Sequence, residues 1–200
     1  MKRLVLASNN PGKLREMRAL LAPLGHEVIA QSALGIAEAE EPHDTFLENA
    51  LAKARHASRA SGLPALADDS GLCVDALDGA PGVHSAYFAG REGSREERDA
   101  RNNAKLLASL GEQRSAHYRC VMVLVRSAHD PAPLVAEGEW HGEIARAPRG
   151  TNGFGYDPLF YLPSLGVTAG ELAASEKNRV SHRALALRKL LALLDADDRG

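Results

Sequence analysis

The first thirty residues constrain the fold more than any other stretch of the chain. Residues 3–7 are a short apolar run typical of a buried strand, and a polar turn follows them. Apolar residues then recur at helical spacing from Leu14 to Leu21, until Pro23 and Gly25 end that pattern. Residues 27–30 have the pattern of a second strand. A strand–loop–helix–strand beginning is typical of α/β proteins.

Two capping boxes predict where later helices begin. Thr45 stands three residues before Glu48, which predicts a helix that runs to about Ser61. Ser94 and Glu97 repeat this spacing and predict a helix that reaches about residue 110. Side chains of this kind satisfy backbone N–H groups that have no partner inside the helix, so the pattern marks a helix start.

The remaining pattern predicts a mixed sheet. Apolar runs at 65–67 and 72–77 predict strands on either side of a turn at 68–71, and 118–125 predicts a further strand. A hairpin is expected between 134–140 and 143–145, then a loop of Pro and Gly at 148–158, and a last helix at 181–194. Because strands and helices do not alternate strictly, a mixed sheet flanked by helices fits better than a purely parallel one.

Composition excludes several classes of protein. The 200 residues are 44% hydrophobic and 25% charged, which is typical of one globular domain. The net charge of −2 offers no basic excess for a nucleic-acid polymer. Cys73 and Cys120 are far apart, which argues against a disulfide framework or a structural zinc site. The first apolar run is too short for a signal peptide and no later run could span a membrane, so the chain is expected in the cytoplasm.

The polar segment Ser8-Asn9-Asn10-Pro11-Gly12-Lys13 lies between the first expected strand and the first expected helix. Backbone N–H groups at a helix start, small hydroxyl and amide donors and one lysine together can bind phosphate groups. The segment is not a Walker A loop, because the first glycine of that motif is missing and Leu14 follows the lysine. An ordinary capped turn with an exposed lysine is the structural alternative.

Two acidic pairs are candidates for metal binding or acid–base chemistry. Asp68 and Asp69 follow an apolar run, and adjacent half-buried carboxylates repel each other unless a cation or donors compensate. Mg²⁺ needs one or two carboxylates together with substrate phosphates, and an aspartate beside the ion can deprotonate a water. The alternative is a solvated Asx-type turn, since Asp-Ser-Gly favours turns. Glu40 and Glu41 form a less specific pair that either adds a ligand or lies in a solvated loop.

The glycine-rich segment 150–157 carries Phe154, Tyr156 and Asp157. Aromatic side chains on such a loop can stack on a nucleobase, which is worth about 1–3 kcal/mol per base. They can instead fill the edge of the core. Both interpretations remain open from the residues alone.

A cluster of hydrogen-bond donors precedes and opens the last expected helix. It includes Lys177, His182 and Arg183, whose side chains suit a purine carbonyl or a phosphate. A serine-capped helix start with surface charges is the structural alternative. Cations so early in a helix oppose its dipole, which mildly favours a binding role.

Six stretches, in order along the chain, resemble the inosine/xanthosine triphosphate pyrophosphatase family. They are residues 8–13, 45–50, 67–72, 79–86, 150–160 and 175–183. Each stretch is a weak signal alone, but six in family order make chance a poor explanation. The resemblance implies an α/β fold with an elongated mixed β-sheet flanked by helices. Residues 1–200 would form one domain with two lobes around a central cleft.

The same resemblance implies an enzyme that hydrolyses non-standard purine nucleoside triphosphates, those of inosine, deoxyinosine and xanthosine. The products would be the monophosphate and pyrophosphate, and the reaction would remove these compounds from the nucleotide pool. It further implies Mg²⁺ as cofactor, a small-molecule substrate and a homodimer.

The resemblance also assigns roles to residues of this sequence. Asp69 would be the general base and a Mg²⁺ ligand, with Asp68 and either Glu41 or Glu40 nearby. The triphosphate would lie on the segment Ser8, Asn9, Asn10, Pro11, Gly12 and Lys13, with Lys53 as a helper, and Ser70 would touch the substrate. The base pocket would be formed by Phe154, Gly155, Tyr156 and Asp157, with Phe154 stacking on the base. Lys177, His182 and Arg183 would bind the base and its six-position carbonyl.

Two other classes of function stay open. One is a purine-nucleotide-binding or sensing module without turnover, which needs the loop at Lys13 and the pocket at Phe154 but not Asp69. The other is a phosphatase for a different phosphorylated metabolite, which would release orthophosphate.

Overall fold

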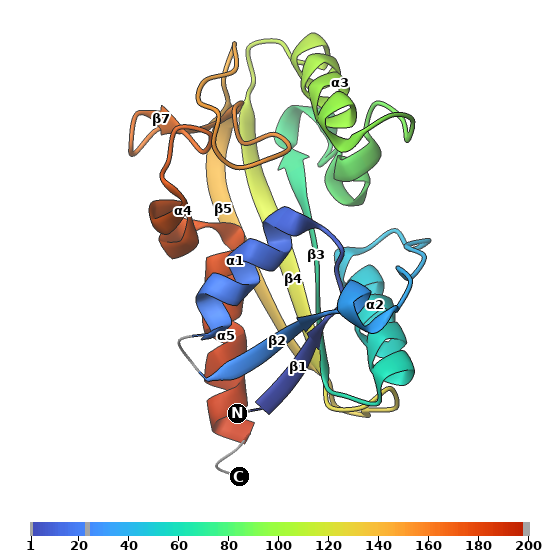
Figure 1. Cartoon of the computed structure of the whole chain (residues 1–200). Coiled ribbons are helices and arrows are strands. Elements are labelled where there is room, and N and C mark those ends of the chain that lie inside the picture. The colour runs from blue at the N-terminus through green and yellow to red at the C-terminus, as the bar shows by residue number, and fades with distance from the viewer. Residues whose placement is uncertain (1, 23–24, 198–200) are drawn as a thin grey trace. The chain divides into compact units, whose positions relative to one another are not determined.

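The computed structural model describes residues 2–22 and 25–197 of the chain (Figure 1). Within these residues the strands are β1 (Lys2–Leu6), β2 (His26–Ala30), β3 (Ala65–Val74), β4 (Ser115–Val125), β5 (Leu134–Ile144), β6 (Phe160–Leu162) and β7 (Val167–Thr168). The α-helices are α1 (Pro11–Leu21), α2 (Phe46–Ser61), α3 (Arg95–Ser109), α4 (Ala174–Val180) and α5 (His182–Asp197). Short 3₁₀ helices, among them η4 (Gly82–Tyr87), connect some of these elements.

The strands of the described residues form one sheet in the order β2-β1-β3-β4-β5-β6-β7. β1 pairs in parallel with β2 and β3, whereas β5–β6 and β6–β7 are antiparallel. The sheet is therefore mixed and flanked by helices, which confirms the predicted fold class. The chain divides into two compact units, of which unit 1 is Met1–Asp69, Cys120–Gly138 and Arg183–Gly200, and unit 2 is Ser70–Arg119 and Glu139–His182. The expected elongation, the two lobes of one domain and the central cleft stay predictions.

The strands of unit 1 contribute side chains to two hydrophobic cores, one on each face of the sheet, because successive side chains of a strand point to opposite faces. Larger residues such as Leu4 and Met122 pack on one face against α1 and α5. Small residues such as Val5 and Val123 pack on the other face, against three buried alanines of α2, Ala50, Ala54 and Ala57. Side chains next to β3 can therefore reach it from α1 on one face and from α2 on the other.

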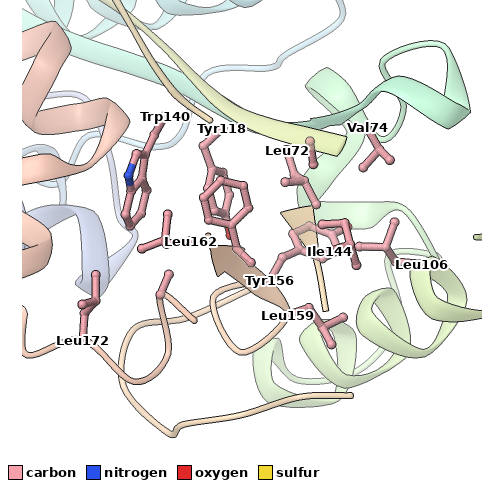
Figure 2. Packing of buried hydrophobic residues seen from close by; sticks show 13 residues of the cluster. Leu72, Val74, Leu106, Tyr118, Trp140, Ile144, Tyr156, Leu159, Leu162 and Leu172 are labelled. Carbon is pink, nitrogen blue, oxygen red and sulfur yellow. The ribbon is translucent and has the colours of Figure 1, made fainter. Parts of the chain in front are cut away.

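Unit 2 has a core of larger aromatic and aliphatic side chains (Figure 2). Tyr118, Trp140 and Phe160 lie within 4.6–6.4 Å of one another, measured between ring centroids. Leu106 of α3 and Leu159, which precedes β6, are fully buried in the same cluster. α3 is therefore fixed to this unit by apolar packing.

The helix starts were predicted well, because each is encoded in a few neighbouring residues. Ser94 and Glu97 make a complete capping box at the start of α3. At α2 the hydroxyl of Thr45 accepts from the Glu48 N–H and donates to the Glu48 carboxylate. α2 ends at Ser61 and α3 at Ser109, close to the expected ends. Pro23, expected to stop the first helix, lies outside the described residues.

Two strand predictions were wrong. The expected turn at 68–71 is part of the continuous strand β3, and the strand ends at Val74 rather than at residue 77. At Gly71 an added Cβ would collide with the backbone carbonyl of Gly82, so this glycine serves a close approach and not a turn.

The predicted hairpin is likewise one strand, β5. Its end stays paired, since the Ile144 N–H donates to the Arg114 carbonyl at 2.8 Å. Gly142 again lies against backbone, at the carbonyl of Tyr161.

The last predicted helix is confirmed as α5, but a separate short helix, α4, precedes it and was not predicted. Ser181 separates the two helices, and its N–H donates to the Lys177 carbonyl at 2.9 Å. Among the described residues, no helix combines the length and the apolarity needed to cross a membrane.

Candidate functional site

The expected phosphate loop joins β1 to α1 and begins that helix. Asn10 is the N-cap, and its Oδ1 accepts hydrogen bonds from the N–H groups of Gly12 (2.9 Å) and Lys13 (3.2 Å). The Ser8 Oγ accepts from the Asn10 N–H at 3.2 Å, and Pro11 occupies the first helical position. The segment is thus a capped helix start, which is the geometry that phosphate binding also uses.

Asp68 and Asp69 are consecutive in β3 and therefore lie on opposite faces of the sheet. Both are buried, with 1% and 7% of their surface exposed. From the sequence, a cation or hydrogen-bond donors were expected to compensate the two carboxylates. In the structure each carboxylate has its own cationic partners, so the two do not act as one pair.

Asp68 belongs to a buried ion-pair network on the face of α1 and α5. Its Oδ2 lies 3.0 Å from the Lys13 Nζ and 3.2 Å from the Arg183 Nε. The other end of that guanidinium lies 2.8 Å from the Glu16 Oε2. Burial alone would lower the pKa of Arg183, but Glu16 and Asp68 outweigh it and raise that pKa above its ordinary value. The network joins the start of α1 to the start of α5.

Asp69 lies on the other face, next to α2. Its Oδ1 accepts from the Lys53 Nζ at 2.9 Å, and its Oδ2 accepts from the Asn49 Nδ2 at 3.4 Å. Lys53 also forms an ion pair with Glu41, whose side chain is 41% exposed. Solvent therefore reaches this face at Glu41, whereas Asp68 and Arg183 on the other face are buried.

The pKa shifts at Asp69 suit a group that exchanges protons. Burial raises the pKa of the Asp69 carboxyl, and the cations Lys53 and Lys13 oppose that rise. For Lys53, burial lowers the pKa, but Asp69, Glu41 and Asp68 together raise it to about 12. Lys53 is thus a permanent cation beside a carboxylate whose proton affinity is increased.

The donor set here fits a divalent cation that also binds substrate phosphates. Glu41 and Asp69 both contact one ammonium group, so their carboxylates converge on a single cation position. Mg²⁺ takes one or two protein carboxylates together with phosphate oxygens. Within the described residues no group of three or more His, Cys, Asp or Glu side chains forms a metal cage. Glu40 is exposed beside Glu41, and Asp68 lies on the opposite face.

Unit 2 holds the remaining expected site residues. The Asp157 Oδ2 accepts from the Phe154 N–H (2.7 Å) and from the Lys177 Nζ (2.6 Å). Tyr156 is part of the unit 2 core, and its hydroxyl donates to the Ser85 carbonyl at 2.9 Å. For Tyr156 the core interpretation is therefore the one that the packing supports, while Phe154 is only half-buried.

The hydrogen-bond donors expected together in residues 175–183 have different partners in the structure. His182 is buried and stacks on Tyr118, with ring centroids 4.7 Å apart and an interplanar angle of 12°. Lys177 lies over the Phe154 ring, 4.8 Å from its centroid. Arg183 belongs to the Asp68 network of unit 1, so the structure does not group it with the other two. Ser70 is half-buried in β3, at the first position of unit 2.

The comparisons with known proteins cover nearly the whole chain. The sequence profile of the Ham1 family matches residues 4–193. The chain belongs to the Ham1 family. The dITP/XTP pyrophosphatase of Burkholderia pseudomallei is 63% identical over 194 residues, which cover 96% of this chain and 93% of that protein. The dITP/XTP pyrophosphatase of Aromatoleum aromaticum is 64% identical over 194 residues, 96% of each chain. A solved HAM1 protein from Coxiella burnetii, 49% identical, aligns with a TM-score of 0.88 over 98% of this chain and all of that chain.

Sequence reasoning missed two partners of the site in this Ham1 chain. Asn49 stands four residues before Lys53, so both lie on one face of α2 and reach Asp69 together. Glu16 stands three residues after Lys13 on α1 and pairs with Arg183. Helical spacing to an already suspected lysine was the signal that could have found both.

Proposed function

We propose that this chain hydrolyses the triphosphates of inosine, deoxyinosine and xanthosine to the monophosphate and pyrophosphate, and so removes them from the nucleotide pool. Relatives named dITP/XTP pyrophosphatase match it over almost their full length. The single observation that carries the proposal is the buried Asp69, held beside Lys53 and Glu41. A binding module without turnover would not need Asp69.

The phosphate end of the substrate would be bound by the start of α1 and by two lysines. Ser8, Asn10 and Lys13 would contact the triphosphate, and Lys53 would neutralise part of its charge. Phosphoryl transfer depends mainly on positioning and on electrostatic stabilisation of the charge on the phosphate oxygens. Because Lys13 is already fixed by Asp68, it is oriented before substrate arrives.

Glu41 and Asp69 are the residues that would hold Mg²⁺, with Glu40 as a neighbouring carboxylate that can reach water. The ion, when bound, would supply positive charge to the phosphate oxygens. Asp68 is the weaker candidate among the expected ligands, because it pairs with two cations and is 1% exposed, whereas Asp69 and Glu41 share one lysine and Glu41 is partly exposed.

Asp69 would act as the general base. It would accept a proton from a water whose oxygen forms a bond to the α-phosphorus. The bond between that phosphorus and the bridging oxygen would break, and the bridging oxygen would leave with pyrophosphate. Burial raises the pKa of Asp69, which favours this role because a general base works best when its pKa lies near the working pH.

The base end would be read by unit 2. Phe154 would stack on the purine, and Lys177 and His182 would donate to the keto oxygen at position six. Adenine carries an amino group there, which would leave those donors unpaired at a cost of about 1–3 kcal/mol each. Arg183, also expected at the base, is bound by Asp68 and Glu16 within unit 1.

The proposal is tested by incubating the protein with Mg²⁺ and the triphosphates of inosine, xanthosine, adenosine and guanosine, and by identifying both products. Pyrophosphate and monophosphate from the inosine and xanthosine substrates are the expected result. Orthophosphate as the product would favour a phosphatase, and a preference for adenosine triphosphate would contradict the proposed selectivity.

A homodimer in the cytoplasm, with a free nucleotide and not a polymer as partner, belongs to the same proposal. The charge of −2 supports a small-molecule partner, since polymer binding favours a basic surface. The mass of the protein in solution at working concentration tests the dimer, and a strict monomer would contradict it.

A further inference from the structure

Helix α3 contacts the expected base loop through three side chains. Arg95, Asp99 and Asn103 are spaced four residues apart, so they lie along one face of the helix. All three reach Phe154 or Gly155. Neither the capping pattern nor the resemblance gave this helix a part in the function.

Both backbone groups of Gly155 are bound by this face. The Gly155 N–H donates to the Asp99 Oδ2 at 3.0 Å, and the Gly155 carbonyl accepts from the Asn103 Nδ2 at 3.0 Å. An acceptor and a donor one helical turn apart thus match the two polar groups of a single residue. Gly155 has φ +63°, a left-handed conformation that a residue with a Cβ rarely adopts. The contact therefore fixes a special backbone conformation directly after Phe154.

The cationic end of the same face lies against the aromatic ring. The guanidinium carbon of Arg95 is 4.9 Å from the Phe154 centroid, and the Arg95 Nε lies 3.8 Å from the Asp99 Oδ2. Asp99 thus joins the backbone of Gly155 to the side chain over Phe154.

The loop has separate attachments that do not involve α3. Tyr156 is buried in the core and donates to Ser85, while Asp157 accepts from the Phe154 N–H. α3 in turn is fixed by Leu106 in the core of unit 2. The polar contacts to Gly155 are therefore not needed to attach either element. Asn103 also keeps its buried Oδ1 without a partner among the described residues, a cost that an apolar residue would avoid.

We propose that Asp99 and Asn103 are positioning residues for purine recognition: by binding Gly155 they set the orientation in which Phe154 stacks on the base. The inference rests on the proposed function, because it takes the Phe154 loop as the purine-binding loop. Neither side chain is required to touch the substrate. Loss of either contact weakens binding of the base and leaves the phosphate end unchanged.

The test compares ligands with and without a purine. Binding of inosine monophosphate and of inorganic pyrophosphate is measured by calorimetry for the wild-type protein and for Asp99→Ala and Asn103→Ala. Alanine keeps the helix propensity high, so α3 is preserved. Each variant is expected to lose about three- to tenfold in affinity for the monophosphate, the range for one hydrogen bond, and to bind pyrophosphate as before.

Conservative variants and a matched control separate positioning from folding. Asp99→Asn keeps an acceptor for the Gly155 N–H and should restore most of the affinity for the monophosphate. Glu96→Ala changes an exposed residue of the same helix and should alter neither ligand. In turnover assays the preference for inosine over adenosine triphosphate should fall in Asp99→Ala and Asn103→Ala, mainly through KM.

Two results have different meanings. If the wild-type protein releases no pyrophosphate from inosine triphosphate, the proposed function fails, and the monophosphate affinities still decide the role of α3. Unchanged monophosphate affinity and unchanged base preference in both alanine variants would overturn the inference. An equal loss of monophosphate and pyrophosphate binding would overturn it too, because it would indicate a general change of fold.

Discussion

Asp68 and Asp69 are neighbours in the chain and opposites in their surroundings. Asp68 forms ion pairs with Lys13 and Arg183, and Arg183 also pairs with Glu16. Asp69 shares Lys53 with Glu41, a side chain that is partly open to water. Because successive side chains of a strand point to opposite faces, one carboxylate pairs through its Oδ2 with two cations, and the other lies beside the partly exposed Glu41.

The difference shows how one strand can serve structure and chemistry at once. A buried carboxylate between two cations is costly to disturb, because removing it leaves charges without compensation. A buried carboxylate with a raised pKa is suited to take up a proton. In the proposed reaction Asp68 would therefore fix Lys13, and Asp69 would activate water.

The largest expected effect is on turnover and comes from Asp69→Asn. Loss of the general base should lower kcat by about 10²–10⁴-fold, since that is the range such groups contribute. Substrate affinity should remain measurable, because Lys13 and Lys53 are retained. Steady-state kinetics with inosine triphosphate and calorimetric binding check this. A variant that keeps a tenth or more of wild-type kcat would remove Asp69 from the catalytic role.

The next effect is on stability and comes from Asp68→Asn. Lys13 and Arg183 would lose their shared carboxylate inside unit 1, which should lower the free energy of unfolding by about 3–5 kcal/mol. Urea denaturation measures the change, and Asp44→Asn, at an exposed position, is the matched control. If both variants lose the same small amount, the network does not stabilise the fold.

Lys53→Met should shift the pH dependence of kcat/KM. The base must be ionised to act, burial raises the pKa of Asp69, and Lys53 opposes that rise. Without Lys53 the pKa of Asp69 rises further, so the acidic limb of the pH–rate profile should move to higher pH. A pH–rate profile checks the direction, and a limb that moves toward lower pH would contradict the assigned pairing.

The smallest effect should separate the two neighbouring glutamates. Glu41 contacts Lys53 beside Asp69, whereas Glu40 is exposed. Glu41→Gln should raise the Mg²⁺ concentration for half-maximal activity by at least about tenfold, the lower end of what loss of a supporting group costs in metal affinity. Glu40→Gln should leave it nearly unchanged. A reversed order would assign the ligand to Glu40.

Features encoded by neighbouring residues were predictable from the sequence, and those set by distant partners were not. The capping residues Ser94 and Thr45 marked helix starts, because a cap depends on the next three residues. The Asp-Ser-Gly tripeptide predicted a turn, yet Asp68 and Asp69 lie in a strand whose charges are balanced from α1, α2 and α5. Those cations are 16 to 115 residues away in the chain. No local pattern contains that information.

The candidate site divides in the same way. Lys13 and Asp69 were candidates from the residues themselves and Lys53 from the resemblance. In the structure both lysines contact the middle of β3, Lys13 at Asp68 and Lys53 at Asp69. Residues that hold them, such as Glu16 and Asn49, became visible only once the helices were placed. The contacts of Asp99 and Asn103 with Gly155 span more than fifty residues and carried no sequence signal.

In the proposed reaction, water activated at Asp69 attacks the α-phosphorus of a purine triphosphate. Its most direct test is hydrolysis of inosine triphosphate in water enriched in heavy oxygen, followed by mass spectrometry of both products. The heavy oxygen is expected in the monophosphate, with none in pyrophosphate. Label in pyrophosphate or in orthophosphate would place the attack at another phosphorus and would contradict the proposed reaction.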